Sequence, residues 1–278
     1  MSEVILKVRE LAKSYGGPNV FQDVSFDILR GERMALIGPN GAGKSTLLNA
    51  IGGQNFASAG KITLIQKDKD GNEKPIDITK LPPNKRLSFG LGRSYQVNNV
   101  FWQLTILENV LLALYGAEKN NLRLINVLDK REDLLAEAER LLKTIDMWEK
   151  REESPTLLSY GEQRMLEMLL AFAAKPDIVL LDEPSAGLPT AEVKAFTDTL
   201  KALAGDTTLL FCAHDMELVF NLADRIIVLF KTIIANGTPE EISNNVEVQE
   251  IYLGSAGDTY DNPGIEEEEE TAAAAAKE

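Results

Sequence analysis

The sequence predicts an α/β fold with a parallel, doubly wound sheet, because apolar runs of strand length alternate with helix-length segments in the second half of the chain. The chain has 278 residues, of which 44% are hydrophobic and 26% charged, as is typical of a folded globular protein. The expected order is a helix near Tyr160–Ala174, a strand at Ile178–Leu181, a helix near Ala191–Leu203, a strand at Thr208–Ala213, a helix at Met216–Leu222 and a strand at Arg225–Phe230.

The N-terminal segment predicts an antiparallel pair of strands followed by a buried strand. Val4–Val8 and Val24–Ile28 alternate apolar and polar side chains, as half-buried strands do, and Gly16–Pro18 supplies the turn region between them. Met34–Ile37 is continuously apolar, which indicates a strand covered on both faces. A glycine-rich loop and a helix that ends near Gly52 follow this strand.

Two further segments precede the parallel sheet. Ile62–Ile65 and Pro75–Ile78 flank the turn Asp70-Gly71-Asn72, which predicts a second hairpin. Apolar residues then recur at helical spacing from Thr105 to Glu153, which predicts an inserted helical subdomain at about residues 97–175. We assign residues 1–255 to one domain and residues 256–278, five glutamates and an alanine run among them, to a solvated tail.

Composition limits the classes of function. No apolar run approaches the roughly 20 residues that a membrane-spanning helix needs, and the N-terminus has no basic stretch before an apolar one, so we expect neither a span nor a secretory signal. The single cysteine, Cys212, excludes an internal disulfide. The formal charge of −14 repels nucleic acid, so no nucleic-acid partner is expected, and the cytoplasm fits best.

A phosphate-binding loop is predicted directly after Met34–Ile37. Its glycines let backbone N–H groups face phosphates, its lysine adds a positive charge, and its serine offers a hydroxyl to Mg²⁺. The strand before it and the helix after it are the context in which such a loop works, so we expect a P-loop NTPase core. The pattern G-x-x-x-x-G-K-[ST] is formed by Gly38, Pro39, Asn40, Gly41, Ala42, Gly43, Lys44, Ser45 and Thr46.

Two acids follow the apolar strand Ile178–Leu181. Ligands of open parallel sheets bind at the carboxyl ends of the strands, which is where Asp182 and Glu183 stand. We interpret Asp182 as a residue that orients the magnesium shell and Glu183 as the general base for an attacking water. Taken alone, the pair could also serve only to solvate a strand end.

A second phosphate-contacting element is predicted at Leu158–Gln163. Ser159 and Glu162 have the spacing of a capping box, which predicts that a helix begins here. The cap does not explain Gly161, because glycine weakens the first turn of a helix unless some group approaches the backbone closely. A helix N-terminus with free N–H groups, a hydroxyl and a glycine suits phosphate contacts.

In this order, Gly38–Thr46, Leu158–Gln163, Ile178–Glu183 and Ala213–Asp215 resemble the motifs of the nucleotide-binding subunit of ATP-binding cassette (ABC) transporters, over about Val4–Gly254. The second of these segments distinguishes the family from GTPases, kinases and motor proteins. The resemblance implies an ATPase that uses ATP and Mg²⁺. It also implies a P-loop NTPase core with a parallel sheet, an antiparallel β subdomain and an inserted helical subdomain.

The resemblance assigns roles to three further residues. Tyr15 would stack on adenine, Gln96 would contact Mg²⁺ and the attacking water as a catalytic residue and metal ligand, and His214 would contact the γ-phosphate. Each residue type in such a setting is, by itself, more often structural. His214 is the only histidine of the chain and follows an apolar strand, as Glu183 does, which favours a functional role.

The resemblance also implies partners. In this family two subunits stack head to tail, so that ATP lies between Lys44 of one copy and Ser159, Gly161 and Glu162 of the other. We therefore expect a homodimer, or a heterodimer with a homologous ATPase subunit. Integral membrane permease subunits are the other expected partners, which places the chain on the inner face of the cell membrane.

Two segments depart from the usual pattern of the family. Pro189 stands where an aspartate is often found in the loop that crosses the dimer, and Tyr160 replaces the first glycine of the Leu158–Gln163 motif. Together with His214–Met216 and Gly237–Ile242, the motif is similar to that of importers of branched-chain amino acids, urea or amides. ATPases of lipid or lipopolysaccharide export share several of these features.

Two other readings differ in class. A soluble ATP-driven clamp without a permease would act on ribosomes, DNA or an iron–sulfur scaffold, although the chain has neither a second cassette nor a long coiled coil. A nucleotide-binding module with little catalysis would fit Pro189 and the altered motif. The presence of Lys44, Asp182, Glu183 and His214 favours a hydrolytic enzyme.

Overall fold

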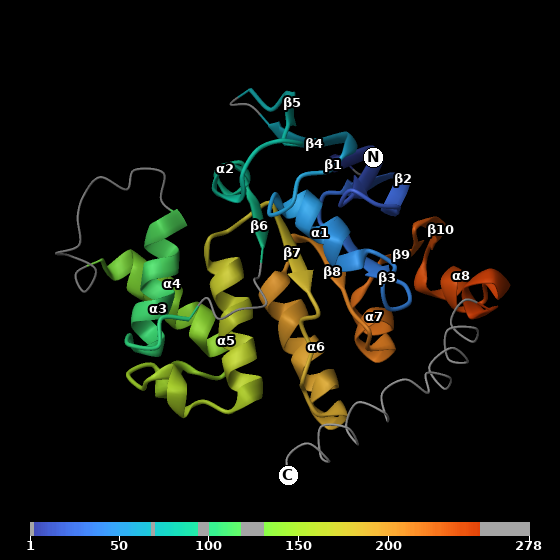
Figure 1. Ribbon diagram of the computed structural model, residues 1–278. Coiled ribbons are helices and arrows are strands. Elements are labelled where there is room, and N and C mark those ends of the chain that lie inside the picture. Colours follow the sequence, from blue (N-terminus) through green and yellow to red (C-terminus); the bar gives the residue numbers. More distant parts are fainter. Residues whose placement is uncertain (1–2, 68–69, 94–99, 118–130, 251–278) are drawn as a thin grey trace, which may run out of the picture.

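The computed structural model describes residues 3–67, 70–93, 100–117 and 131–250. They form two sheets, with helices packed around the larger one (Figure 1). The predicted α/β fold, with its parallel and antiparallel parts, is confirmed.

The smaller sheet is antiparallel, with the strand order β2-β1-β4-β5. β1 pairs with β2 on one side and with β4 on the other, so the two predicted hairpins join into one sheet. This arrangement holds the start of the chain and the segment after the first helix together. The strands are β1 (Val4–Ser14), β2 (Asn19–Leu29), β4 (Ala59–Lys67) and β5 (Glu73–Asp77).

The larger sheet has the strand order β10-β9-β3-β8-β7-β6, and all of its pairs are parallel except the edge pair β9–β10. Every residue of β7 and β8 is buried, as expected for parallel strands covered on both faces. The carboxyl ends of β3, β7 and β8 therefore meet at one edge. The strands are β3 (Arg33–Ile37), β6 (Leu91–Arg93), β7 (Ile178–Asp182), β8 (Thr208–Cys212), β9 (Arg225–Phe230) and β10 (Thr232–Gly237).

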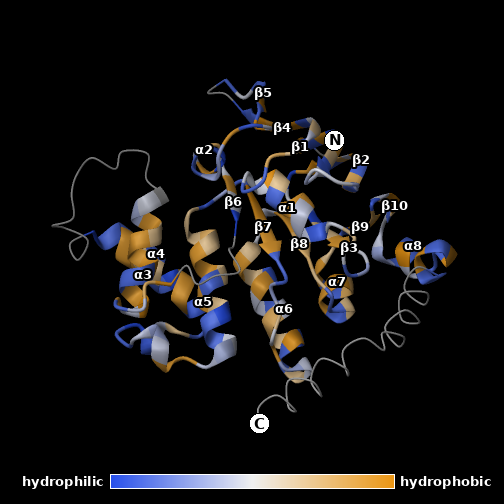
Figure 2. Ribbon diagram, in the orientation of Figure 1, coloured by the Kyte–Doolittle hydropathy of each residue, from blue (hydrophilic) through white to orange (hydrophobic). Residues whose placement is uncertain are grey.

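Side chains on the two faces of this sheet enter two separate apolar cores. Met34 and Leu36 pack toward β1, β2, β4 and α1 (Lys44–Gly52), whereas Ala35 and Ile37 pack toward the other helices. Three of those helices are α5 (Tyr160–Ala173), α6 (Thr190–Ala204) and α7 (Met216–Leu222). Figure 2 shows the apolar residues concentrated in the central strands and in the helices beside them.

Between β6 and β7 the described residues form helices and no strand. They are α3 (Ile106–Ala117), α4 (Glu132–Thr144), two short 3₁₀ turns at Trp148–Lys150 and Pro155–Leu157, and α5. The faces expected to be apolar are buried, with Val110 and Leu111 on α3 and Ala138 and Leu142 on α4. None of the helices in the described ranges has the length and hydropathy of a bilayer span.

Four short elements were not expected from the sequence: β6, β10, α2 (Pro83–Ser88) and α8 (Pro239–Ser243). β9 and β10 form a hairpin around Lys231, which adopts the left-handed conformation (φ 63°). Lysine at this position gives no turn signal, because glycine and asparagine are the residues that usually adopt positive φ. The sequence therefore does not predict this hairpin.

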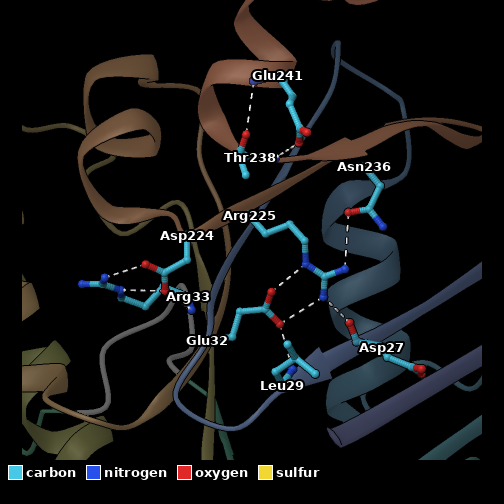
Figure 3. Close-up of polar contacts among 9 residues, drawn as sticks. All are labelled: Asp27, Leu29, Glu32, Arg33, Asp224, Arg225, Asn236, Thr238 and Glu241. Carbon is cyan, nitrogen blue, oxygen red and sulfur yellow. Dashed lines mark hydrogen bonds and ion pairs between the residues drawn. The ribbon is translucent and has the colours of Figure 1, made fainter. Parts of the chain in front are cut away.

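A group of ion pairs connects the β2–β3 turn to the start of β9 (Figure 3). The guanidinium of Arg225 donates to the carboxylate of Glu32 at 2.6 and 3.0 Å, and also to the backbone carbonyl of Asp27. Arg33 donates to Asp224 from both its backbone and its side chain. These contacts fix the end of the parallel sheet opposite to the end that carries the candidate site.

Candidate functional site

The loop between β3 and α1 has the geometry of a phosphate cradle. Gly38 and Gly43 both have positive φ, and a Cβ at Gly38 would lie 2.1 Å from the carbonyl oxygen of Leu229 in β9. The close passage of β9 therefore requires glycine at position 38. Gly43 is the N-cap residue of α1 and has no side chain that could accept a hydrogen bond. The N–H groups of the first helical turn therefore have no partner from the N-cap and can bind an anion.

Lys44 folds back over this loop. Its ammonium group donates to the carbonyl oxygens of Gly38 at 2.7 Å and of Pro39 at 3.1 Å, and the residue is only 6% exposed. Burial lowers the pKa of Lys44, and the neighbouring carboxylates of Glu183 and Asp182 act in the opposite direction. A cation held in this way is ready to exchange carbonyl contacts for phosphate oxygens.

Ser45 and Asp182 meet beside the loop. The Ser45 hydroxyl donates to Oδ1 of Asp182 at 3.3 Å, and Asp182 is 3% exposed at the end of β7. Burial raises the pKa of Asp182, while the guanidinium of Arg93 and the hydroxyl of Ser45 lower it. A hydroxyl and a carboxylate side by side are the hard oxygen ligands that Mg²⁺ prefers, so the donor set fits this ion.

Arg93 is a residue of this site that sequence reasoning missed. It ends β6, and its guanidinium lies 3.4 Å from Oδ2 of Asp182 and 2.7 Å from Oε1 of Gln54. The described residues contain no group of three His, Cys, Asp or Glu that could enclose a metal ion.

Glu183 and His214 are brought together by the sheet. Glu183 follows β7 and His214 follows β8, and Nε2 of His214 lies 3.2 Å from Oε1 of Glu183. Glu183 has a left-handed backbone (φ 49°), and its N–H donates to the carbonyl of Cys212. Positive φ is uncommon for glutamate, and such strained residues cluster at functional sites. Both side chains are partly exposed and can reach a ligand.

The helix α5 begins as the sequence predicts. The Ser159 hydroxyl accepts from the N–H of Glu162, and the Glu162 carboxylate accepts from the N–H of Ser159. An ion pair with Lys150 lowers the pKa of Glu162. The group that approaches Gly161 is Glu192 in α6 of the same chain, whose Oε2 would lie 3.0 Å from a Cβ at Gly161.

The structure does not place this helix start at the loop. Within the part of the chain that the structure describes, no hydrogen bond or ion pair joins Ser159, Gly161 or Glu162 to Gly38–Thr46. Ser159 is exposed, so a second molecule can reach it. Of the residues expected from the sequence, one chain therefore brings together Lys44, Ser45, Asp182, Glu183 and His214, with Arg93 beside them.

Two candidate residues are not among these five. Tyr15, in the β1–β2 connection, is 62% exposed, with the ammonium of Lys13 4.6 Å from its ring centroid and the amide of Asn55 3.4 Å from its hydroxyl. A ring face is thus available to a ligand. Gln96 lies outside the described residues, three positions after Arg93.

Comparisons with known proteins identify the family. A sequence profile described as ABC transporter matches residues 21–186, and one described as Branched-chain amino acid ATP-binding cassette transporter matches residues 232–258. The high-affinity branched-chain amino acid transport ATP-binding protein LivG of Salmonella typhimurium is 35% identical to this chain over 92% of it and 100% of LivG. The lipopolysaccharide export system ATP-binding protein LptB of Haemophilus influenzae is 34% identical, over 90% of this chain and 97% of LptB.

Solved structures agree with this result. MJ1267, an ATP-binding cassette of an ABC transporter solved in its ADP conformation, matches with a TM-score of 0.76 and 29% identity over 91% of this chain and 100% of that chain. The bacterial ABC transporter cassette MJ0796, solved as a dimer, matches with a TM-score of 0.67 and 25% identity over 84% of this chain and 99% of that chain. The chain therefore belongs to the ATP-hydrolysing, nucleotide-binding subunits of the ABC transporter family.

Proposed function

We propose that this ATPase powers a separate membrane permease that takes up branched-chain amino acids, urea or similar small polar solutes. The observation that carries the ATPase site is the meeting of Lys44, Ser45, Asp182, Glu183 and His214 at the carboxyl edge of the parallel sheet. The solute class is supported by the match at residues 232–258 and by the similarity to LivG. The chain works on the cytoplasmic face of the membrane.

Each residue of the site has one task in this proposal. Lys44 and the N–H groups of the loop bind the phosphates of ATP, and Ser45, Asp182 and Gln96 hold Mg²⁺, which neutralises phosphate charge. Glu183 accepts a proton from the attacking water. His214, whose Nε2 lies 3.2 Å from Oε1 of Glu183, contacts the γ-phosphate, and Tyr15 stacks on adenine.

The complete site requires two chains. Ser159, Gly161 and Glu162 of one copy contact the nucleotide held by Lys44 of the other, with a homologous subunit as the alternative partner. The exposed start of α5 and the dimer of the related cassette MJ0796 support this arrangement. ATP favours the closed pair because its γ-phosphate contacts both chains, and hydrolysis removes those contacts.

Export of a lipid is the alternative that a specific observation favours, because LptB is 34% identical to this chain. The test is co-expression with the membrane proteins encoded beside this chain, purification in mild detergent, and reconstitution into vesicles with ATP inside. We expect co-purification and uptake of labelled leucine. A membrane complex that moves lipid would support export, and a soluble complex without a membrane protein would overturn both proposals.

A further inference from the structure

A buried arginine of α5 holds the backbone that follows β7. Arg164 is 8% exposed, and its guanidinium donates to the carbonyl oxygens of Glu183 at 2.9 Å and of Pro184 at 3.1 Å. The remaining guanidinium nitrogen, Nη1, donates to the carboxylate of Glu167 at 2.8 Å, and Glu167 is also 8% exposed. The ion pair with Glu167 neutralises the arginine and fixes its direction.

A second side chain of α5 contacts the segment after β7 at a position closer to α6. Tyr160, four residues before Arg164 and so on the same face of α5, donates its hydroxyl to the carbonyl of Ala186 at 2.9 Å. A Cβ at Gly187 would lie 2.8 Å from the Tyr160 hydroxyl oxygen. Three carbonyl groups between Glu183 and Ala186 therefore accept hydrogen bonds from two side chains of one helix.

These contacts act on the strained residue of the site. The left-handed backbone of Glu183 is unfavourable for a residue other than glycine and persists only where the surroundings fix it. Its N–H donates to the carbonyl of Cys212 in β8, and its carbonyl accepts from Arg164. The backbone N–H of Glu183 is thus hydrogen-bonded to the sheet, and its carbonyl group is hydrogen-bonded to α5. The direction of the Glu183 side chain depends on both hydrogen bonds.

We propose that Arg164, held by Glu167 and assisted by Tyr160, is a positioning residue that sets Glu183 for reaction and transmits displacements of α5 to it. This inference rests on the proposed function, in which Ser159 at the start of α5 contacts the nucleotide of the partner copy. Nucleotide bound at one site then changes the position of Glu183 in the other site through a single helix.

The first test compares Arg164→Lys with wild type as full-length chains. Lysine keeps the charge but cannot bridge two carbonyls and a carboxylate with fixed geometry. We expect kcat for ATP hydrolysis to fall about tenfold to a hundredfold, as small misplacements of catalytic groups do, while the Kd for a fluorescent ATP analogue stays at the wild-type value. Arg140→Lys, on the exposed face of α4, is the matched control and should hydrolyse ATP at the wild-type rate.

A double-mutant cycle separates positioning from general structure. If Arg164 acts through Glu183, then Arg164→Lys produces no further loss of single-turnover rate when Glu183 is already replaced by glutamine. An equal loss in both backgrounds would overturn the inference, and so would a folded Arg164→Lys with wild-type kcat.

Milder variants decide the question if Arg164→Lys does not fold. Tyr160→Phe removes one hydroxyl, and Glu167→Gln removes one charge, and each should lower kcat while the Kd for the ATP analogue remains that of wild type. Unchanged kcat in both would overturn the inference and leave the proposed function standing. A wild-type chain that neither binds nor hydrolyses ATP, with its membrane partner supplied, would overturn both.

Discussion

Nε2 of His214 lies 3.2 Å from Oε1 of Glu183, although the two residues are 31 positions apart in the chain. The contact arises because β7 and β8 are parallel neighbours whose carboxyl ends coincide, with Asp182 opposite Cys212 in register. Glu183, one position after β7, and His214, two positions after β8, therefore meet at the same edge. This register, more than any local signal, assembles the proposed base and its histidine.

Replacing Glu183 with glutamine should stop turnover without preventing ATP binding. The amide keeps the shape of the side chain but cannot accept the proton of the attacking water, and general-base catalysis contributes about 10²–10⁴-fold. Phosphate release should fall by this factor, and size-exclusion chromatography with Mg-ATP should show an accumulated dimer. Glu139→Gln, on the exposed surface of α4, is the control. Undiminished hydrolysis would rule out Glu183 as the base.

Replacing Lys44 with methionine should weaken ATP binding. The ammonium group donates to loop carbonyls in the free protein, and in the complex it would donate to phosphate oxygens. A charge-assisted hydrogen bond contributes about 1.5–3 kcal/mol, roughly a tenfold to hundredfold change in Kd. Equilibrium titration with a fluorescent ATP analogue measures the effect, and Lys143→Met on α4 is the control. An unchanged Kd would show that the loop binds phosphate without its lysine.

Arg86 is expected to be the most costly arginine to remove for stability. It is fully buried, and its guanidinium donates to the carbonyl oxygens of Leu81, Ala50, Ile51 and Thr79. Two of these acceptors lie in the last turns of α1, so Arg86 secures the C-terminal end of the helix that begins at Lys44.

Arg86→Met should leave those carbonyl groups without their donor, at about 1–3 kcal/mol each. We expect the free energy of unfolding, measured by urea titration with circular dichroism, to fall by at least about 3 kcal/mol. Lys194→Met, at an exposed position of α6, should change it by less than about 0.5 kcal/mol. Equal unfolding midpoints for the two variants would mean that water replaces the guanidinium.

Glu137 should contribute stability that depends on pH. The guanidinium of Arg140 and the ammonium of Lys175 lower the pKa of Glu137 to about 2, against about 4.3 in an unfolded chain. Because the folded state holds the charged form more strongly, this contribution is complete above about pH 4.3 and is lost as the pH falls toward 2. The difference in melting temperature between wild type and Glu137→Gln should therefore shrink across this range. A difference that stays constant from pH 6 to pH 3 would contradict the assignment.

Elements with local start and stop signals could be predicted from the sequence. The expected helix Met216–Leu222 and strand Arg225–Phe230 have the observed bounds, because Asp215 caps the helix by accepting from the N–H of Leu218 and the strand is one apolar run. The capping box of Ser159 and Glu162 was found for the same reason. Each signal lies within four residues of the element that it defines.

The buried arginines could not be predicted. Arg86, Arg93 and Arg164 have little exposure, yet charged residues in a sequence usually mark exposed positions. Their acceptors are supplied by distant segments, such as Ala50 for Arg86 and Pro184 for Arg164. Only the assembled fold shows which carbonyl groups converge, so these roles become visible with the structure alone.

The contact between Tyr160 and Gly187 restricts how the family can vary. The tyrosine ring and hydroxyl occupy the space in which a side chain at position 187 would lie. A relative with glycine at the position of Tyr160 has that space open, and its loop can then accept asparagine or aspartate at the position of Gly187, since these residues tolerate the positive φ. In an alignment of homologous sequences the two positions should consequently be exchanged as a pair, and a lone change at either one should be rare.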